Sequence, residues 1–333
     1  MSAFQRFAVA GFAAGVLLAA TLGPPLWVIA VLAAAGVVTA FAVVLATRLL
    51  TGQEALVYQH HEIAILAVSS GVLALAGRPV LADLDAVALG VGVMLAAGRL
   101  GCLSAGCCHG RPAAIGVRYQ RTRLDGTFPP QLAGVRLFPV QALEAVLILV
   151  IVGVGVAMIE AGAAPGAAVA WYVTASAAER FVLELLRGDT QRRRWRGVTE
   201  PQWLALALTA GVAIGGAGWG HTVTVCVLAA ATVALALLGG AMIDDRDISA
   251  LAACVHAAPS GSVELVALPC GAIVSAGRTG AARHLTMSRA DGAPVDPRQA
   301  RRLARVMAHL VRAPRRPEIR PGAGATMHVL LDG

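Results

Sequence analysis

Eight apolar runs constrain the fold of this chain more than any other feature, because a helix needs about 20 mainly apolar residues to cross a bilayer. The runs cover 7–22, 25–47, 62–77, 83–103, 139–160, 166–187, 202–218 and 221–242. Only 14% of the residues are charged and 57% are hydrophobic, whereas about a quarter of a soluble domain is charged. We therefore expect an all-α polytopic membrane protein with seven or eight transmembrane helices, since the seventh run is short.

The composition changes after the last apolar run. From 246 to 333 the chain carries 12 arginines and six acidic residues. Alternating patterns at 263–268 and 326–331 predict strands. A basic amphipathic helix is predicted at 297–313, and its apolar face carries Leu303, Val306, Met307 and Leu310. We expect a membrane domain over 1–243 and a small basic α+β domain over 244–333, whose role the sequence does not reveal.

All 27 basic residues are arginines, and the chain has no lysine. This composition excludes chemistry that needs a lysine Schiff base or a phosphate-binding loop with a lysine. It favours recognition of phosphate or carboxylate by the paired donors of a planar guanidinium group. A GC-rich genome would equally explain the absence of lysine.

The six cysteines do not follow the spacing of a small disulfide-bonded domain. Cys226 lies within an apolar run, and we expect it to pack in the core. We expect no cleavable signal peptide, because the first apolar run leads directly into the second.

Polar residues interrupt the apolar pattern in four segments, at 58–62, 98–110, 139–144 and 179–189. In the last segment Arg180, Glu184 and Arg187 are spaced i, i+4 and i+7, which places them on one helix face. A charge at membrane depth is costly unless it is paired or faces a polar cavity. Arg99 and Arg180 therefore predict a polar cavity within the helical bundle.

Two convergent arginines suit a phosphate, and His60 or His61 is a candidate general base. Simpler structural interpretations also fit the sequence. The arginines could be partners in ion pairs that hold helices together, and an interfacial histidine could be hydrogen-bonded to the backbone.

Three cysteines and a histidine offer ligands of the kind that bind zinc or copper. They are Cys102, Cys107, Cys108 and His109. Their spacing lacks the C-x2-C separation that is usual in zinc sites, so we expect no metal.

The four polar segments, in this order, resemble the bacterial prolipoprotein diacylglyceryl transferase family over roughly 55–205. The strongest parts of the resemblance are G-R-L-G-C-L-x-x-G-C-C-x-G-R-P at 98–112, P-x-Q-x-x-E at 139–144, and R-F-x-x-E-x-x-R-G-D at 180–189 followed by Gln202-Trp203. One such motif alone would be weak evidence for the family, but several motifs in the same order along a polytopic chain are specific evidence for it.

The resemblance implies a multi-pass transferase of the bacterial cytoplasmic (inner) membrane that acts in lipoprotein biosynthesis. Such enzymes move the diacylglyceryl group of phosphatidylglycerol onto the lipobox cysteine of a prolipoprotein, which forms a thioether and releases glycerol phosphate. The implied partners are phosphatidylglycerol, the prolipoprotein signal peptide and the lipid bilayer. No nucleic acid, metal or organic cofactor is implied.

The resemblance also implies roles for individual residues. Arg99 and Arg180 would hold the phosphate, and His60 or His61 would help to deprotonate the substrate thiol. Glu144 would orient its neighbours. Other residues expected to bind substrate are Gly98, Gly101 and Gly110, where the backbone can approach the headgroup, together with Cys102, Gln141, Glu184 and Arg187.

The chain departs from the family pattern at several points. Many members carry asparagine at the position of Cys102 and an acidic residue at the position of Cys107. The family's His-Gly-Gly motif is replaced by His60-His61-Glu62, so the histidine assignment is ambiguous by one residue. The domain over 244–333 has no counterpart in the minimal family architecture.

Alternative functions therefore stay open. The chain could be a paralogous transferase with another acceptor, or a non-catalytic binding protein or transporter for an anionic phospholipid, which would need the arginines but neither histidine. A redox or metal sensor built on Cys107, Cys108 and His109 is a third hypothesis.

Two sequence signals predict opposite orientations of the chain in the membrane. Eight spans would place all basic loops and both termini on one side, which the positive-inside rule assigns to the cytoplasm. The family resemblance places these loops on the extracytoplasmic side, and we expect the family orientation.

Overall fold

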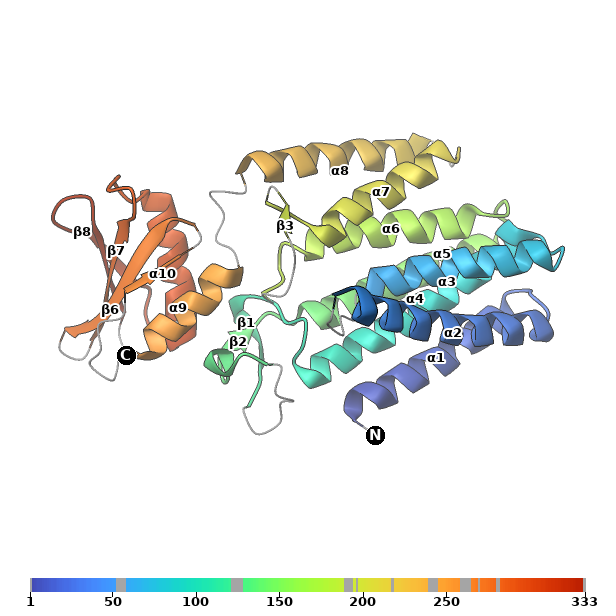
Figure 1. The fold of residues 1–333 in the computed structure, drawn as a ribbon, viewed down its shortest axis with the longest axis horizontal. Coiled ribbons are helices and arrows are strands. Elements are labelled where there is room, and N and C mark those ends of the chain that lie inside the picture. The colour runs from blue at the N-terminus through green and yellow to red at the C-terminus, as the bar shows by residue number, and fades with distance from the viewer. Residues whose placement is uncertain are drawn as a thin grey trace. The chain divides into compact units, whose positions relative to one another are not determined.

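The computed structural model describes residues 2–51, 58–120, 128–188, 194–195, 197–216, 219–238, 245–257, 265–268, 270–279 and 282–331. The chain divides into two compact units, each of which is described by itself (Figure 1). The first unit comprises Met1–Ser104, Ala142–Glu184 and Glu200–Thr232, and the second comprises Ala105–Gln141, Leu185–Thr199 and Val233–Gly333. The predicted domain boundary at 243/244 lies outside the described residues.

Long helices supply nearly all of the first unit, and the last of them, α8, ends within the second unit. They are α1 (Ala3–Thr21), α2 (Leu26–Thr51), α3 (Tyr58–Leu75), α4 (Val80–Ala105), α5 (Val140–Glu160), α6 (Ala167–Leu183), α7 (Glu200–Ile214) and α8 (Trp219–Leu238). Local sequence fixes several of their ends. Ser2 and Gln5 form a capping box at the start of α1. The buried Asp85 on α4 accepts hydrogen bonds from the backbone N–H groups of Gly166 and Val169, and so caps the start of α6.

Five helices in the described part of the chain are long and apolar enough to cross a membrane. These spans are Ala3–Thr21, Leu26–Leu50, Val80–Ala105, Val140–Glu160 and Gly220–Leu237. The chain is therefore a helical membrane protein. The three remaining predicted runs also form helices, but α6 and α7 are short, with 17 and 15 residues. The third, α3, begins with a polar stretch that lowers its hydropathy.

Large apolar side chains face outward on the spanning helices. Leu49 on α2, Val146 on α5 and Leu237 on α8 are 76%, 58% and 81% exposed. Such a surface is unfavourable in water and suits contact with lipid tails. Cys226 on α8 belongs to this surface, because it is exposed. The prediction that Cys226 packs in the core is therefore wrong, since an apolar residue in a membrane helix can face lipid as readily as protein.

Close backbone contact between α1 and α4 depends on two glycines. A Cβ atom at Gly90 would lie 2.6 Å from the carbonyl oxygen of Gly15 and 3.3 Å from its carbonyl carbon. Small residues allow membrane helices to approach closely and gain van der Waals contact. Gly15 and Gly90 therefore set the distance between these two helices.

We expect Gly90→Ala to destabilise the first unit by about 1–3 kcal/mol, because the new methyl group meets backbone that cannot rotate away. Thermal unfolding of the purified protein in detergent measures the effect. Gly153→Ala on α5 is the matched control, since nothing lies within 4 Å of a Cβ at that position. An equal effect of both substitutions would contradict the role of the α1–α4 contact.

Short strand pairs lie in the second unit. β1 (Pro112–Arg118) pairs antiparallel with β2 (Arg136–Leu137), and the pairing shifts register between Pro112 and Val117. β3 (Arg194–Trp195) pairs antiparallel with β4 (Val198–Thr199). A 3-10 turn, η2 (Pro130–Leu132), precedes β2.

The C-terminal part of the chain is an antiparallel sheet with two helices on one face (Figure 1). Its elements are α9 (Asp245–Ala257), β5 (Leu265–Ala267), β6 (Ala272–Thr279), β7 (Ala282–Arg289), α10 (Pro297–Val311), β8 (Glu318–Pro321) and β9 (Met327–Leu331). The strand order is β5-β6-β7-β9-β8. The predicted α+β architecture is thus confirmed, with β5, β9 and α10 at the predicted positions, although 263–264 lie outside the described residues.

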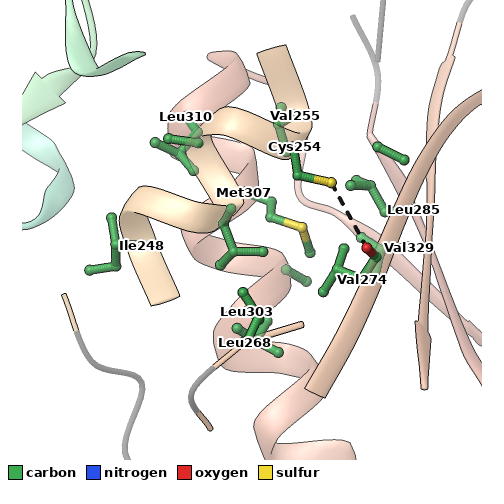
Figure 2. Packing of buried hydrophobic residues seen from close by; sticks show 14 of the residues in the cluster. Ile248, Cys254, Val255, Leu268, Val274, Leu285, Leu303, Met307, Leu310 and Val329 are labelled. Atoms are coloured by element: carbon green, nitrogen blue, oxygen red, sulfur yellow. Dashed lines mark hydrogen bonds between the residues drawn. The ribbon is translucent and has the colours of Figure 1, made fainter. Parts of the chain in front are cut away.

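An apolar core joins α9 and α10 to the sheet (Figure 2). Leu303, Met307 and Leu310 of α10 are buried there, as predicted from their spacing, and Val306 is half-buried. Cys254 on α9 also lies in this core, where its thiol donates a weak hydrogen bond to the carbonyl oxygen of Val274 on β6. The arginines of α10 occupy the opposite, exposed face of the helix.

Candidate active site

A cavity of about 40 Å³ lies inside the first unit, among α3, α4, α5, α6 and α7. This volume can hold on the order of three water molecules. Its lining includes these polar residues: Tyr58, Gln59, Glu62, Arg99, Glu144, Ser176, Glu179 and Arg180. The predicted polar cavity is present, and it contains both predicted arginines.

Glu144 on α5 joins the two arginines. Its Oε2 atom lies 2.9 Å from Nε of Arg99 on α4, and its Oε1 atom lies 2.9 Å from Nη1 of Arg180 on α6. Arg180 also pairs with Glu184 one helical turn later, at 3.4 Å between Nη2 and Oε2. All of these groups are nearly excluded from solvent, and buried charges are tolerated only when they are paired in this way.

Tyr58 packs over Arg99. The Arg99 guanidinium carbon lies 5.1 Å from the centre of the Tyr58 ring, a cation–π distance. Gly98 makes this possible, because a Cβ at that position would lie 2.7 Å from Cζ of the ring. Gly98 therefore leaves space for a ring beside the arginine.

Neither predicted histidine lines the cavity. His60 Nε2 lies 3.1 Å from Oε1 of Glu200 on α7, and both side chains are nearly half-exposed. His61 is buried. The cavity-lining positions of α3 are 58, 59, 62, 63 and 66, which share one helix face.

Two further residues predicted to bind substrate, Gly101 and Cys102, lie near the end of α4. Cys102 is buried. Gly101 faces Phe4 of α1, where a Cβ would lie 2.9 Å from the Phe4 ring. In this structure Gly101 therefore permits packing between α4 and α1.

Backbone hydrogen bonds hold three motif segments together in the second unit. Gly110 N–H donates to Phe138 O at 3.1 Å, and Phe138 N–H donates to Arg111 O at 2.9 Å. Arg111 N–H donates to Leu186 O at 3.1 Å. Because Gly110 also forms a bridge with Arg187, the segments around 110, 138 and 187 form one structural element.

Side chains reinforce this element. Arg111 donates through Nε to the carbonyl oxygen of Arg187 at 3.0 Å, and Gln141 donates through Nε2 to the carbonyl oxygen of Cys107 at 2.7 Å. A Cβ at Gly188 would lie 2.6 Å from the carbonyl oxygen of Gly110. Gln141 and Arg187 are both buried, so they belong to the protein interior.

The motif residues thus divide between the two units. Arg99, Glu144 and Arg180 line the cavity, and Glu184 pairs with Arg180 beside it. Gly110, Gln141 and Arg187 belong to the hydrogen-bonded element of the second unit. A family model described as prolipoprotein diacylglyceryl transferase matches residues 7–219. The chain belongs to this family. No curated protein and no solved structure matches the chain.

Membership of the transferase family confirms the resemblance that the motifs predicted. The match ends at residue 219, so α9, α10 and the C-terminal sheet lie beyond it. The family match covers every residue of the cavity lining.

Sequence reasoning missed five polar residues of the cavity lining: Tyr58, Glu62, Gln59, Ser176 and Glu179. Helical periodicity contained the signal for the first two, because positions 58 and 62 are one turn apart and on the same face, while 60 and 61 are turned away. Glu179 precedes Arg180 directly, and only the packing of α6 against the other helices shows that both line the cavity.

Proposed function

We propose that this protein transfers the diacylglyceryl group of phosphatidylglycerol to the thiol of a prolipoprotein lipobox cysteine. One observation supports this most directly: Arg99 and Arg180, from different helices, converge on the two oxygens of a single carboxylate inside the cavity of the first unit. Guanidinium groups held in this way can bind a phosphate through charge-assisted hydrogen bonds. Membership of the transferase family supports the same substrate class.

In the proposed reaction the thiol sulfur attacks the glyceryl carbon that carries the phosphate. A C–S bond forms, the C–O bond to phosphate breaks, and glycerol phosphate leaves with the bonding electron pair. Arg99 and Arg180 stabilise the charge that develops on the phosphate oxygens. The thiol must lose its proton, because the thiolate is the nucleophile, and His60 or His61 stays the proposed acceptor.

The remaining predicted residues keep proposed supporting roles. Glu144 and Glu184 would hold the two arginines in position. Gly98 would leave space for Tyr58 beside Arg99, and Gly101 would support the site through the packing of α4 against α1. Cys102 in the first unit and Gly110, Gln141 and Arg187 in the second unit stay proposed substrate-binding residues. We also propose that α3, α6 and α7 cross the bacterial inner membrane together with the five longer helices.

An acyl-transfer assay tests the proposed function. The purified protein in detergent is mixed with phosphatidylglycerol labelled in its acyl chains and with a lipobox peptide. We expect label on the peptide cysteine, and none on a peptide with serine at that position. Label transfer that persists undiminished in Arg99→Ala would contradict the site assignment, and no transfer by folded, lipid-bound protein would contradict the reaction itself.

The same assay separates the main alternative. A binding protein or transporter would bind phosphatidylglycerol in an arginine-dependent manner without labelling the peptide. His60→Ala and His61→Ala then distinguish the two functions, because only the transferase reaction needs a proton acceptor.

A further inference from the structure

The outer face of α10 carries a dense group of positive charges. Four exposed arginines lie on it, and their spacing of i, i+3, i+4 and i+7 places them on one side of the helix. We call these four residues the basic face: Arg298, Arg301, Arg302 and Arg305. Because each guanidinium group stays charged at any physiological pH, the basic face is a permanent surface of positive charge.

Carboxylates do not neutralise the basic face. The sequence of α10 contains no acidic residue, and the carboxylate of Asp296 at its N-cap accepts a hydrogen bond from the backbone N–H of Arg298. Within the ranges that the structure describes, none of the four guanidinium groups has an ion-pair partner. By contrast, Arg320 on β8 pairs with Glu318. The charge of the basic face is therefore open to an anionic partner.

The apolar face of α10 is already occupied. Leu303, Met307 and Leu310 are buried in the core between the helices and the sheet (Figure 2). A helix that inserts among lipids needs a free apolar face to bury at the bilayer interface. A partner of the basic face must therefore be held by charge at the surface of α10, without insertion of the helix.

The chain connects this helix closely to a membrane span. α8 contains the span Gly220–Leu237 and ends at Leu238, and α9 begins at Asp245. A fully extended chain covers at most about 25 Å in the seven residue steps between these helices. The C-terminal part of the chain therefore stays close to the bilayer surface.

A second connection to the bilayer is the segment between α4 and α5, which are both membrane-spanning helices. Leu132, Val135 and Leu137 of this segment share one apolar core with α9 and α10 within the second unit. Leu137 lies three residues before Val140, where the span of α5 begins. The segment that packs against α9 and α10 thus runs directly into the bilayer.

These connections favour a lipid surface as the anionic partner. Lipid headgroups carry phosphate, which accepts the paired donors of a guanidinium group. Clusters of four or more basic residues on an amphipathic helix next to a membrane span are typical of anionic-lipid binding. A nucleic acid offers the same phosphate chemistry, but the membrane connections do not bring it to the basic face.

We propose that the basic face of α10 binds the anionic headgroups of the bilayer that the chain's own helices cross, and holds the C-terminal part against the membrane surface. The inference goes beyond the transfer reaction, because the family match ends at residue 219 and α10 lies after it. Because the contact is electrostatic and at the surface, salt should weaken it.

Arginine footprinting of the full-length protein in lipid nanodiscs tests the inference. The discs contain either phosphatidylcholine alone or equal amounts of phosphatidylcholine and phosphatidylglycerol. Phenylglyoxal, an uncharged reagent, modifies arginines to a low extent, and mass spectrometry of the peptides gives each rate. We expect the basic face to react at least about fivefold more slowly in the anionic discs. This protection should disappear at about 1 M salt, where the Debye length is about 3 Å.

Arg320 is the internal control in the same digest. It is in register with His328 on the neighbouring strand β9. Val329, the next residue of β9, is buried in the core with α10, and successive side chains of a strand point to opposite faces. Arg320 therefore lies on the other side of the sheet from α10, and its rate of modification should be the same in both kinds of disc.

A pair of double variants separates the basic face from net charge. Arg301→Gln/Arg305→Gln removes half of the basic face and leaves the apolar core of α10 intact, so we expect the two remaining arginines of the face to lose most of their protection. Arg289→Gln/Arg320→Gln makes the same charge change outside α10 and should retain the protection.

Three outcomes would overturn the inference. The first is equal reactivity of the basic face in both kinds of disc, and the second is an equal loss of reactivity at Arg320. The third is the same loss of protection in both double variants. Protection by a short DNA duplex in phosphatidylcholine discs, together with none by phosphatidylglycerol, would assign the basic face to nucleic acid instead.

Discussion

Replacement of Arg99 or Arg180 by alanine is expected to lower the rate of diacylglyceryl transfer by about a hundredfold to a thousandfold. Removal of one preorganised donor to a developing oxyanion typically has an effect of this size. Both guanidinium groups are held by Glu144 before substrate binds, so they need no reorganisation in the reaction. The measurement is the initial rate of label transfer from phosphatidylglycerol to the lipobox peptide.

Arg180→Lys sharpens this prediction. A lysine keeps the positive charge but cannot contact Glu144 and Glu184 at once with a planar, forked group. We expect its rate to lie much closer to that of Arg180→Ala than to that of the wild type. Arg6→Ala, at an exposed position near the start of α1, should leave the rate unchanged. If Arg180→Lys were as active as the wild type, charge alone would explain the role of Arg180.

Glu144→Ala is expected to destabilise the first unit by about 3–5 kcal/mol. Loss of one partner from a buried ion pair leaves an uncompensated charge at low dielectric. Here two arginines, 4% and 11% exposed in their side chains, would lose a shared partner and repel each other. Equilibrium unfolding of the detergent-solubilised protein measures the change, and Glu160→Ala at the exposed end of the same helix is the control.

A second variant separates the effect of the charge of Glu144 on stability from the effect of its side-chain shape. Glu144→Gln keeps the shape of the side chain and removes its charge, so we expect it to be destabilised as well, by less than Glu144→Ala. A free energy of unfolding for Glu144→Ala within about 0.5 kcal/mol of the control would show that Glu144 does not hold the arginines in place, since a surface substitution usually has an effect no larger than this.

The family, the helical membrane architecture and the two arginines could be predicted from the sequence because each depends on local pattern. Spans follow from runs of apolar residues, and an arginine within such a run must face a polar partner whatever the packing. The buried face of α10 could also be predicted from local pattern, because the spacing of Leu303, Met307 and Leu310 places them on one side of the helix.

The error at Cys226 and the uncertainty over spans have a common cause. In a membrane helix, apolar residues face protein and lipid alike, so hydrophobicity does not tell inside from outside. The sequence therefore predicted a core position for Cys226, although its side chain is exposed. Hydropathy does not mark α3 as a candidate span, because its start carries polar residues, of which Tyr58, Gln59 and Glu62 line the cavity.

By itself the sequence determined which helices form, which family the chain belongs to, and that Arg99 and Arg180 need polar partners. Only the tertiary structure decided what those partners are. Glu144 is 45 residues from one arginine and 36 from the other along the chain, and Glu62 and Glu179 meet the same cavity from helices α3 and α6. The physical reason is that periodicity fixes which face of a helix a residue occupies, whereas the packing of helices distant in sequence fixes what that face meets.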